Sequence, residues 1–99
     1  MTGVLATGPV VTLPAIVDVR VAEPLKAELT ALRGQAVTID ASAVERLGGL
    51  GLQVLMSAVR TWRADGQDLI FINVSEAMTE QWQGFGAPMN DLEAQDAAA

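Results

Sequence analysis

Short runs of apolar, largely β-branched residues recur along the chain and predict its strands. The first covers residues 10–13, between breaks that contain proline, and the second covers residues 36–40. A third run at 69–72, Leu-Ile-Phe-Ile, contains no polar residue, which is typical of a central strand covered on both faces. Upstream of these, Val4-Leu5 is either a further edge strand or part of a tail.

Between the strands, apolar residues recur at helical spacing. Residues 22–33 predict one helix, with Pro24 in its first turn, Gly34 after its end, and leucines at i, i+4 and i+7 on one face. A longer helix is predicted from Gly49 or Leu50 to Ala64. The residues expected on its core face are Leu52, Leu55, Met56, Val59 and Trp62.

A third helix is predicted after Ser75, whose hydroxyl suits a helix N-cap. Met78, Trp82 and Phe85 fall on one face of this helix, so we expect them to be buried together. Beyond the glycines and proline that break it, residues 89–92 predict a last helical turn.

The alternation of strands and helices predicts the fold class. The 28 residues between positions 40 and 69 are enough for a right-handed βαβ crossover. We therefore expect an α/β domain over residues 9–92, with a mixed sheet of four to five strands and three to four helices packed against it. Residues 1–8 are expected to be a tail or edge strand, and residues 93–99 a frayed tail.

Composition and charge narrow the classes of function. The net charge of −6 argues against binding to nucleic acid or to anionic membrane surfaces. The chain has no Cys and no His, which excludes thiolate catalysis, Cys-based metal sites and the commonest general base and metal ligand, and we expect no metal or cofactor. No run approaches the ~20 apolar residues of a membrane span. The first residues also lack the charged region of a signal peptide, so a cytoplasmic location is expected.

The most specific stretch covers residues 37–55, where a short apolar strand leads through a polar turn into a glycine-rich helix start. This order resembles the STAS domain, typified by bacterial anti-sigma factor antagonists. In that family a strand ending in Asp precedes an Asp-Ser-Ser/Thr-Gly-Leu-Gly type segment, where a partner kinase phosphorylates a hydroxyl. Ile39-Asp40 matches the strand end and Gly51-Leu52 matches the Gly-Leu, and the resemblance covers roughly residues 10–88.

The chain departs from the family pattern at the switch itself. Gly48, Gly49 and Leu50 precede Gly51, so the expected acid and phosphoacceptor are missing. The resemblance therefore implies a STAS module without its usual switch. Leu50 either packs in the core or stays partly exposed as an apolar anchor, and in the second case Leu47 is the residue that could form an apolar patch with it.

The resemblance and the local chemistry together predict a partner-binding surface at the turn and the first helical turn. Glycines allow close backbone approach, and a helix N-terminus has N–H groups without intrahelical acceptors. We favour a turn-forming role for the carboxylate that ends the strand over a role in orienting a hydroxyl. The residues expected in the surface are Asp40, Ser42, Arg46, Gly48, Gly49, Leu50 and Gln53.

Two catalytic or ligand-binding alternatives are weaker. The glycines at 48, 49 and 51 suggest a phosphate loop, but no Gly-Lys-Ser/Thr follows them. A small hydrolase using Asp40 with Ser42 would need a base and an orienting group. We therefore expect a regulatory protein without enzymatic activity.

Several protein partners fit the resemblance. Within the family, residues 40–55 look most like small STAS proteins encoded with alphaproteobacterial chemotaxis genes, which makes a chemotaxis-linked adaptor the first hypothesis. An antagonist that binds an anti-sigma kinase is the second, and the STAS subunit of a lipid-transport ATPase complex is the third. The sequence leaves self-association open.

Overall fold

The strands form two small sheets in the computed structural model, which describes residues 8–92. The larger sheet contains β1 (Val10–Thr12), β3 (Val37–Asp40) and β5 (Leu69–Ile72), with β3 in the centre. The smaller one pairs β2 (Ile16–Val17) with β4 (Arg46–Leu47). All of these pairs are parallel.

The α/β class is thus confirmed, and the detail of the sheet differs from the expectation. We expected one mixed sheet, whereas the five strands between residues 8 and 92 are divided between two parallel sheets. The strand considered at Val4-Leu5 and the tail at 93–99 lie outside the described residues.

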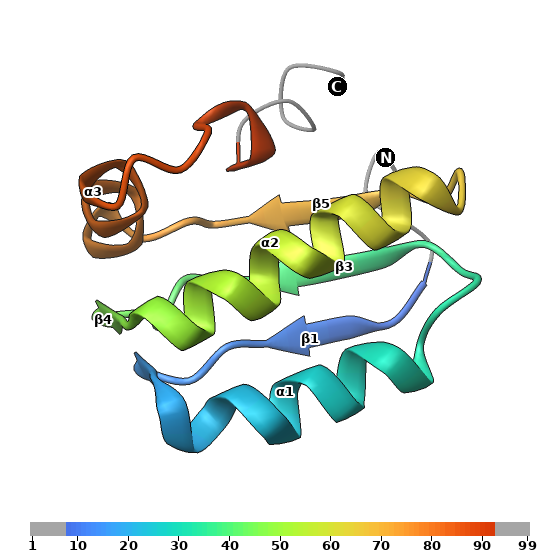
Figure 1. The fold of residues 1–99 in the computed structure, drawn as a ribbon, viewed down its shortest axis with the longest axis horizontal. Coiled ribbons are helices and arrows are strands. Elements are labelled where there is room, and N and C mark those ends of the chain that lie inside the picture. The colour runs from blue at the N-terminus through green and yellow to red at the C-terminus, as the bar shows by residue number, and fades with distance from the viewer. Residues whose placement is uncertain (1–7, 93–99) are drawn as a thin grey trace.

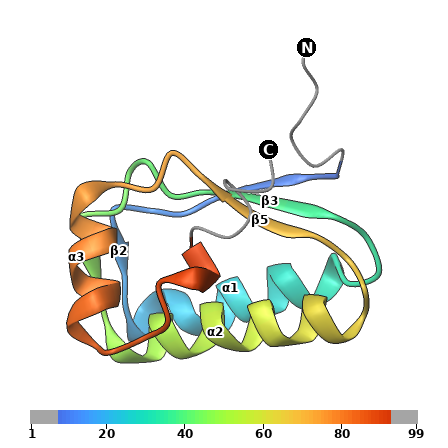
Figure 2. The same cartoon turned by 90° about the horizontal axis from the view of Figure 1, so that it is seen from above.

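Helices α1 (Val19–Ala31) and α2 (Gly49–Ala64) lie side by side across one face of the larger sheet, as Figures 1 and 2 show. Helix α3 (Glu76–Gly84) stands at the end toward which the strand arrows point. Residues 90–92 form the predicted last helical turn. Because a helix that follows a parallel strand starts at that strand's carboxyl end, α1 and α2 both begin near this end of the molecule.

The core lies between the sheet and the helices. Val11, Ile39 and Phe71 are neighbours in register across the three strands and are at most 1% exposed. Strand β5 alternates between buried and half-buried residues and lies at a sheet edge. The expectation that β5 is central and covered on both faces was therefore wrong, because an apolar run does not specify strand order.

Helix α3 closes the end of the core through two large side chains. Met78 and Trp82 are fully buried, as predicted, and the Trp82 ring meets the Phe71 ring edge-on with centroids 6.1 Å apart. Ser75 caps the helix, since its hydroxyl accepts a 3.0 Å hydrogen bond from the Met78 N–H. Phe85 is 50% exposed, contrary to expectation, because the helix ends at Gly84 and Phe85 no longer follows its periodicity.

Helix α1 begins three residues earlier than predicted. The carboxylate of Asp18 accepts a 3.0 Å hydrogen bond from the Arg20 N–H and caps the helix. Pro24 therefore lies in the second turn, where its missing N–H leaves one intrahelical bond unmade. The predicted start followed the usual first-turn preference of proline, whereas the actual start is fixed by Asp18 as the N-cap residue.

Candidate partner-binding surface

The surface predicted from the sequence centres on the first turn of α2. Gly48 is the N-cap residue and supplies no side-chain hydrogen bond to the helix. The first amide groups of the helix therefore lack a side-chain cap. Leu50 follows in the first turn and is 48% exposed, so the core alternative for this residue is wrong.

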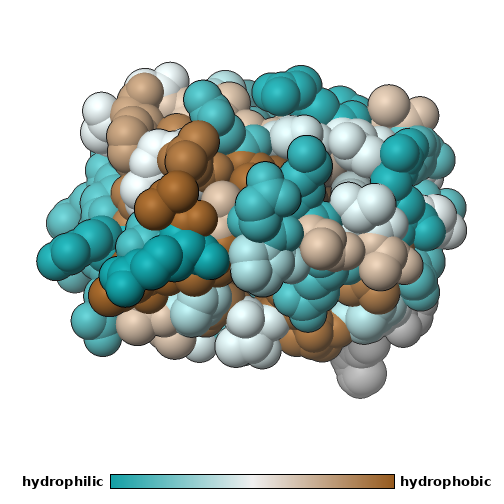
Figure 3. Space-filling view, turned by 60° about the horizontal axis from the view of Figure 1, so that its bottom comes forward, coloured by the Kyte–Doolittle hydropathy of each residue, from teal (hydrophilic) through white to brown (hydrophobic). Residues whose placement is uncertain are grey.

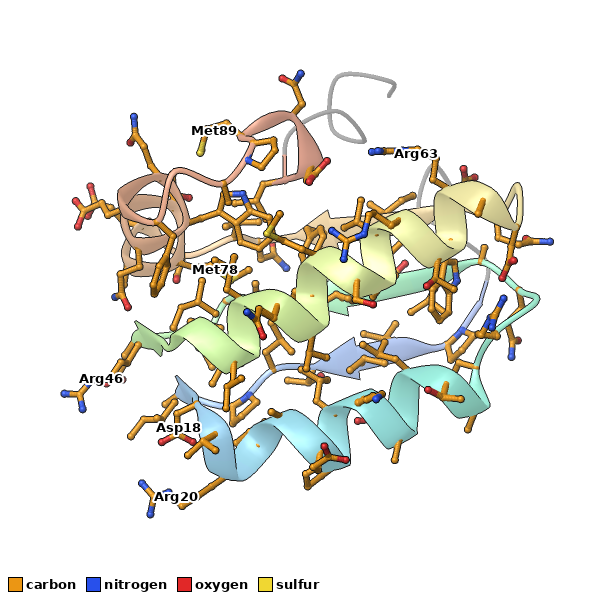
Figure 4. All side chains as sticks on the ribbon, in the orientation of Figure 1. Asp18, Arg20, Arg46, Arg63, Met78 and Met89 are labelled. Atoms are coloured by element: carbon orange, nitrogen blue, oxygen red, sulfur yellow. The ribbon has the colours of Figure 1, made fainter. Side chains whose placement is uncertain are left out.

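The other predicted residues differ in position and exposure. Ser42, Arg46, Gly49 and Gln53 are exposed, and Gly48 is half-buried. Figure 4 shows the Arg46 side chain projecting outward at the end where α1 and α2 begin. All of them lie on the segment from the end of β3 to the second turn of α2, and whether a partner binds them stays a prediction.

Leu47 does not join Leu50 in an apolar patch. It is only 3% exposed and belongs to the core. Its position in β4 explains the difference, since alternate residues of a strand face opposite sides and the neighbouring Arg46 is the outward one.

Two apolar residues that the sequence pattern did not indicate are also exposed at the end of the molecule where both helices begin. Ile16 in β2 is 39% exposed, and Val19 in the first turn of α1 is 62% exposed. Val19 lines the same groove as Leu50. Figure 3 shows the face on which α1 lies, and apolar side chains gather on its left, the side on which both helices begin. Asp is a common N-cap residue, so Asp18 could have placed the start of α1 at Val19 and indicated that Val19 is exposed there.

Asp40 forms the turn that we favoured. One carboxylate oxygen accepts a 2.9 Å hydrogen bond from the backbone N–H of Ser42, two residues later. This backbone hydrogen bond is the main reason why the pKa of Asp40 is lowered below its usual value, and a hydrogen bond from the Ser42 side chain is the second reason. A carboxylate with a lowered pKa is a weaker base, so the geometry offers no support for the hydrolase alternative.

Gly51 serves the packing of the domain itself. A Cβ at this position would lie 2.7 Å from Cγ1 of Val17 and would overlap the Val17 carbonyl oxygen. We expected the glycines in this segment to allow close approach by a partner's backbone. At Gly51 the close neighbour is strand β2, whereas a Cβ at Gly49 would meet nothing within 4 Å.

A side chain from α3 holds β4 in place. The Gln81 amide oxygen accepts a hydrogen bond from the Leu47 N–H at 2.6 Å, and its amide nitrogen donates to the Glu45 carbonyl at 2.9 Å. Gln81 thereby pairs with the free edge of β4 as a neighbouring strand would. No local sequence signal could predict this, because the partners are more than 30 residues apart.

Residues 8–92 contain neither a cluster of metal-binding side chains nor a membrane-spanning helix. Between residues 8 and 92, no group of three or more acidic side chains is placed to hold a metal ion. In the same range, no helix is both long enough and apolar enough to cross a bilayer.

Comparisons with known proteins agree with the resemblance seen in the sequence. The structure is similar to a crystal structure of a sulfate transporter family protein from Wolinella succinogenes, with a TM-score of 0.71 and 16% sequence identity. The match covers 95% of this chain and 85% of the other, and at this identity it shows the shared fold. No curated protein matches the chain. A family model described as "Mlab, STAS domain" matches residues 5–87, and the chain therefore belongs to this STAS family.

Proposed function

We propose that this protein is a non-catalytic regulatory module that binds a larger protein through the start of α2, without a phosphorylation switch. Membership of the STAS family supports a regulatory, interaction-mediating role. The proposed surface consists of the seven residues predicted from the sequence, and Leu50 is its apolar anchor.

Leu50 is the observation that carries the proposal. By the resemblance of residues 37–55 it corresponds to the position of the family's phosphoacceptor, and its side chain is 48% exposed in the first turn of α2. Because about half of its side chain stays in contact with water, Leu50 contributes less to the stability of the isolated domain than a fully buried leucine would. Burial of its remaining apolar surface against a partner would stabilise a complex, at roughly 25 cal/mol per Å².

A chemotaxis signalling component is the first partner to test. The resemblance of residues 40–55 to small chemotaxis-linked STAS proteins supports this choice. An anti-sigma kinase and a lipid-transport ATPase complex are the alternatives, and the neighbouring genes distinguish the three. We place the module in the cytoplasm, where all three partners would meet it.

The substitution Leu50→Glu tests the surface. We expect partner binding to be lost with the fold retained, because a charge would be placed in a desolvated contact. The partner would be captured from lysate, identified by mass spectrometry, purified and titrated by calorimetry. Val10→Glu is the matched control, since Val10 is 58% exposed but lies on β1.

Two results would contradict this proposal. A folded Leu50→Glu variant with unchanged affinity would place the interface elsewhere. Stable phosphorylation after incubation with the partner kinase and ATP, detected by intact mass, would contradict a module without a switch. Ser42 is the first hydroxyl to examine in that case, because it is exposed on the same segment.

A further inference from the structure

A groove runs between α1 and α2 on the face turned away from the sheet. It has a volume of about 450 Å³ and extends from Val19 and Leu50 at one end to Arg33 and Trp62 at the other. Leu50 and Gln53 belong both to this groove and to the proposed partner-binding surface. The groove is therefore continuous with that surface.

Small side chains on both helices leave this space open. Ala22 and Ala58 lie along the groove and are nearly buried, while Thr30 and Ser57 are short and exposed. Larger residues at these four positions would fill the gap between the helices. The lining also includes Val54 and Leu29, so most of its contact surface is apolar.

The charge of the groove differs from that of the rest of the protein. Within residues 8–92, Lys26 and Arg33 are two of the six basic residues and both line the groove, whereas Glu23 is the one lining residue among ten acidic ones. Arg33 is ion-paired with Asp65 at 3.0 Å, whereas Lys26 makes no ion pair within residues 8–92. An apolar groove whose edge carries a lysine without an ion pair among the described residues, on a protein of net charge −6, favours an occupant that offers a carboxylate to Lys26.

We infer that this groove receives an acidic amphipathic α-helix of the partner, an inference that rests on the proposed function and specifies the partner's secondary structure. Its apolar stripe would contact the floor between the helices, and a carboxylate would meet Lys26. The groove follows α1, which has 13 residues, so it accommodates a helix of about three and a half turns, roughly 20 Å long. The expected stripe has apolar residues at i, i+4, i+7 and i+11.

The test uses a synthetic helical peptide as the probe. It has about 14 residues, with leucine at the stripe positions and glutamate on the other face. Control peptides replace glutamate with lysine or scramble the leucine positions. Binding to the ¹⁵N-labelled full chain is followed by NMR chemical-shift perturbation, which also reports whether each variant remains folded.

Three variants of the protein locate the binding. Ser57→Trp fills the groove from an exposed position and should weaken the binding of the glutamate peptide by more than about tenfold. Arg60→Trp is the matched control, because Arg60 is exposed on α2 but does not line the groove. Lys26→Glu should lower the affinity for the glutamate peptide by about 3- to 10-fold and raise the affinity for the lysine peptide.

The inference is overturned if Ser57→Trp binds the peptide as well as Arg60→Trp does, or if the lysine peptide binds the unmodified chain equally well. It is also overturned if sedimentation shows a dimer that Ser57→Trp dissociates, since the occupant would then be a second copy. The natural partner separates the two proposals. If Leu50→Glu loses that partner and Ser57→Trp keeps it, the groove assignment fails while the proposed function stands.

Discussion

The substitution Gly51→Ala should destabilise the domain because the first turn of α2 lies against β2. The new Cβ would be 2.7 Å from Val17 Cγ1 and 3.0 Å from the Val17 carbonyl carbon. The carbonyl oxygen cannot move away freely, since it accepts a 2.8 Å hydrogen bond from the Gly48 N–H. Either the start of α2 shifts outward or this hydrogen bond is strained.

The expected magnitude is a difference between two effects. Overpacking of one methyl group costs about 1–3 kcal/mol, and replacing glycine by alanine in a helix returns about 0.5–1 kcal/mol. The difference between these two ranges is about 0–2.5 kcal/mol, and we expect a net loss of about 1–2.5 kcal/mol in the free energy of unfolding, because two of the new contacts would lie below 3.0 Å. For a domain of this size, that lowers Tm by roughly 4–20 °C.

Gly49→Ala is the matched control, in the same turn of the same helix. A Cβ there meets nothing within 4 Å, so we expect unchanged or slightly increased stability. Urea unfolding followed by circular dichroism, with a thermal melt, measures both variants. Equal stability of the Gly51→Ala variant and the unmodified protein would refute the argument, because it would show that α2 does not pack tightly on β2.

Three further predictions concern the core, the turn and the support of β4. Trp62 is 2% exposed, so Trp62→Ala should cost about 3–5 kcal/mol in urea unfolding, and an unchanged midpoint would contradict its place in the core. Because the Asp40 pKa is lowered, its stabilisation is present above pH about 4 and lost as the pH falls through that pKa. NMR titration should show the pKa rising in Ser42→Ala while staying below its usual value, since the backbone bond remains. Gln81→Ala should speed hydrogen exchange at the Leu47 amide, and an unchanged rate would show that the Gln81 hydrogen bond does not protect this amide.

Elements with a long, regular pattern could be predicted from the sequence. The bounds of α2 and β5 agree with the expectation to within a residue. In α2 the apolar stripe repeats over four turns and ends at Asp65-Gly66, and Gly66 has the positive φ of 71° that a chain reversal requires. Local periodicity and local breakers are sufficient in such segments.

Elements that depend on distant partners could not be predicted in the same way. Strands β2 and β4 have two residues each, too few to show a period, and they exist because Ile16 pairs with Arg46 and Val17 with Leu47. The burial of Leu47 follows from that pairing, so the apolar patch expected from Leu47 was also wrong. The exposed partner of Leu50 is instead Val19, brought near it by the fold of α1 against α2.

The position of Leu50 depends on contacts from three separate parts of the chain. Val17 lies against Gly51 immediately after it, and Gln81 of α3 bonds the backbone of β4 just before it. On the upstream side, Asp40 closes the turn that begins this segment. A backbone supported in this way loses little conformational entropy when a partner covers the surface, which lowers the cost of binding. For a module that we propose to bind without a phosphorylation switch, such pre-organisation replaces the ordering that a phosphate would otherwise control.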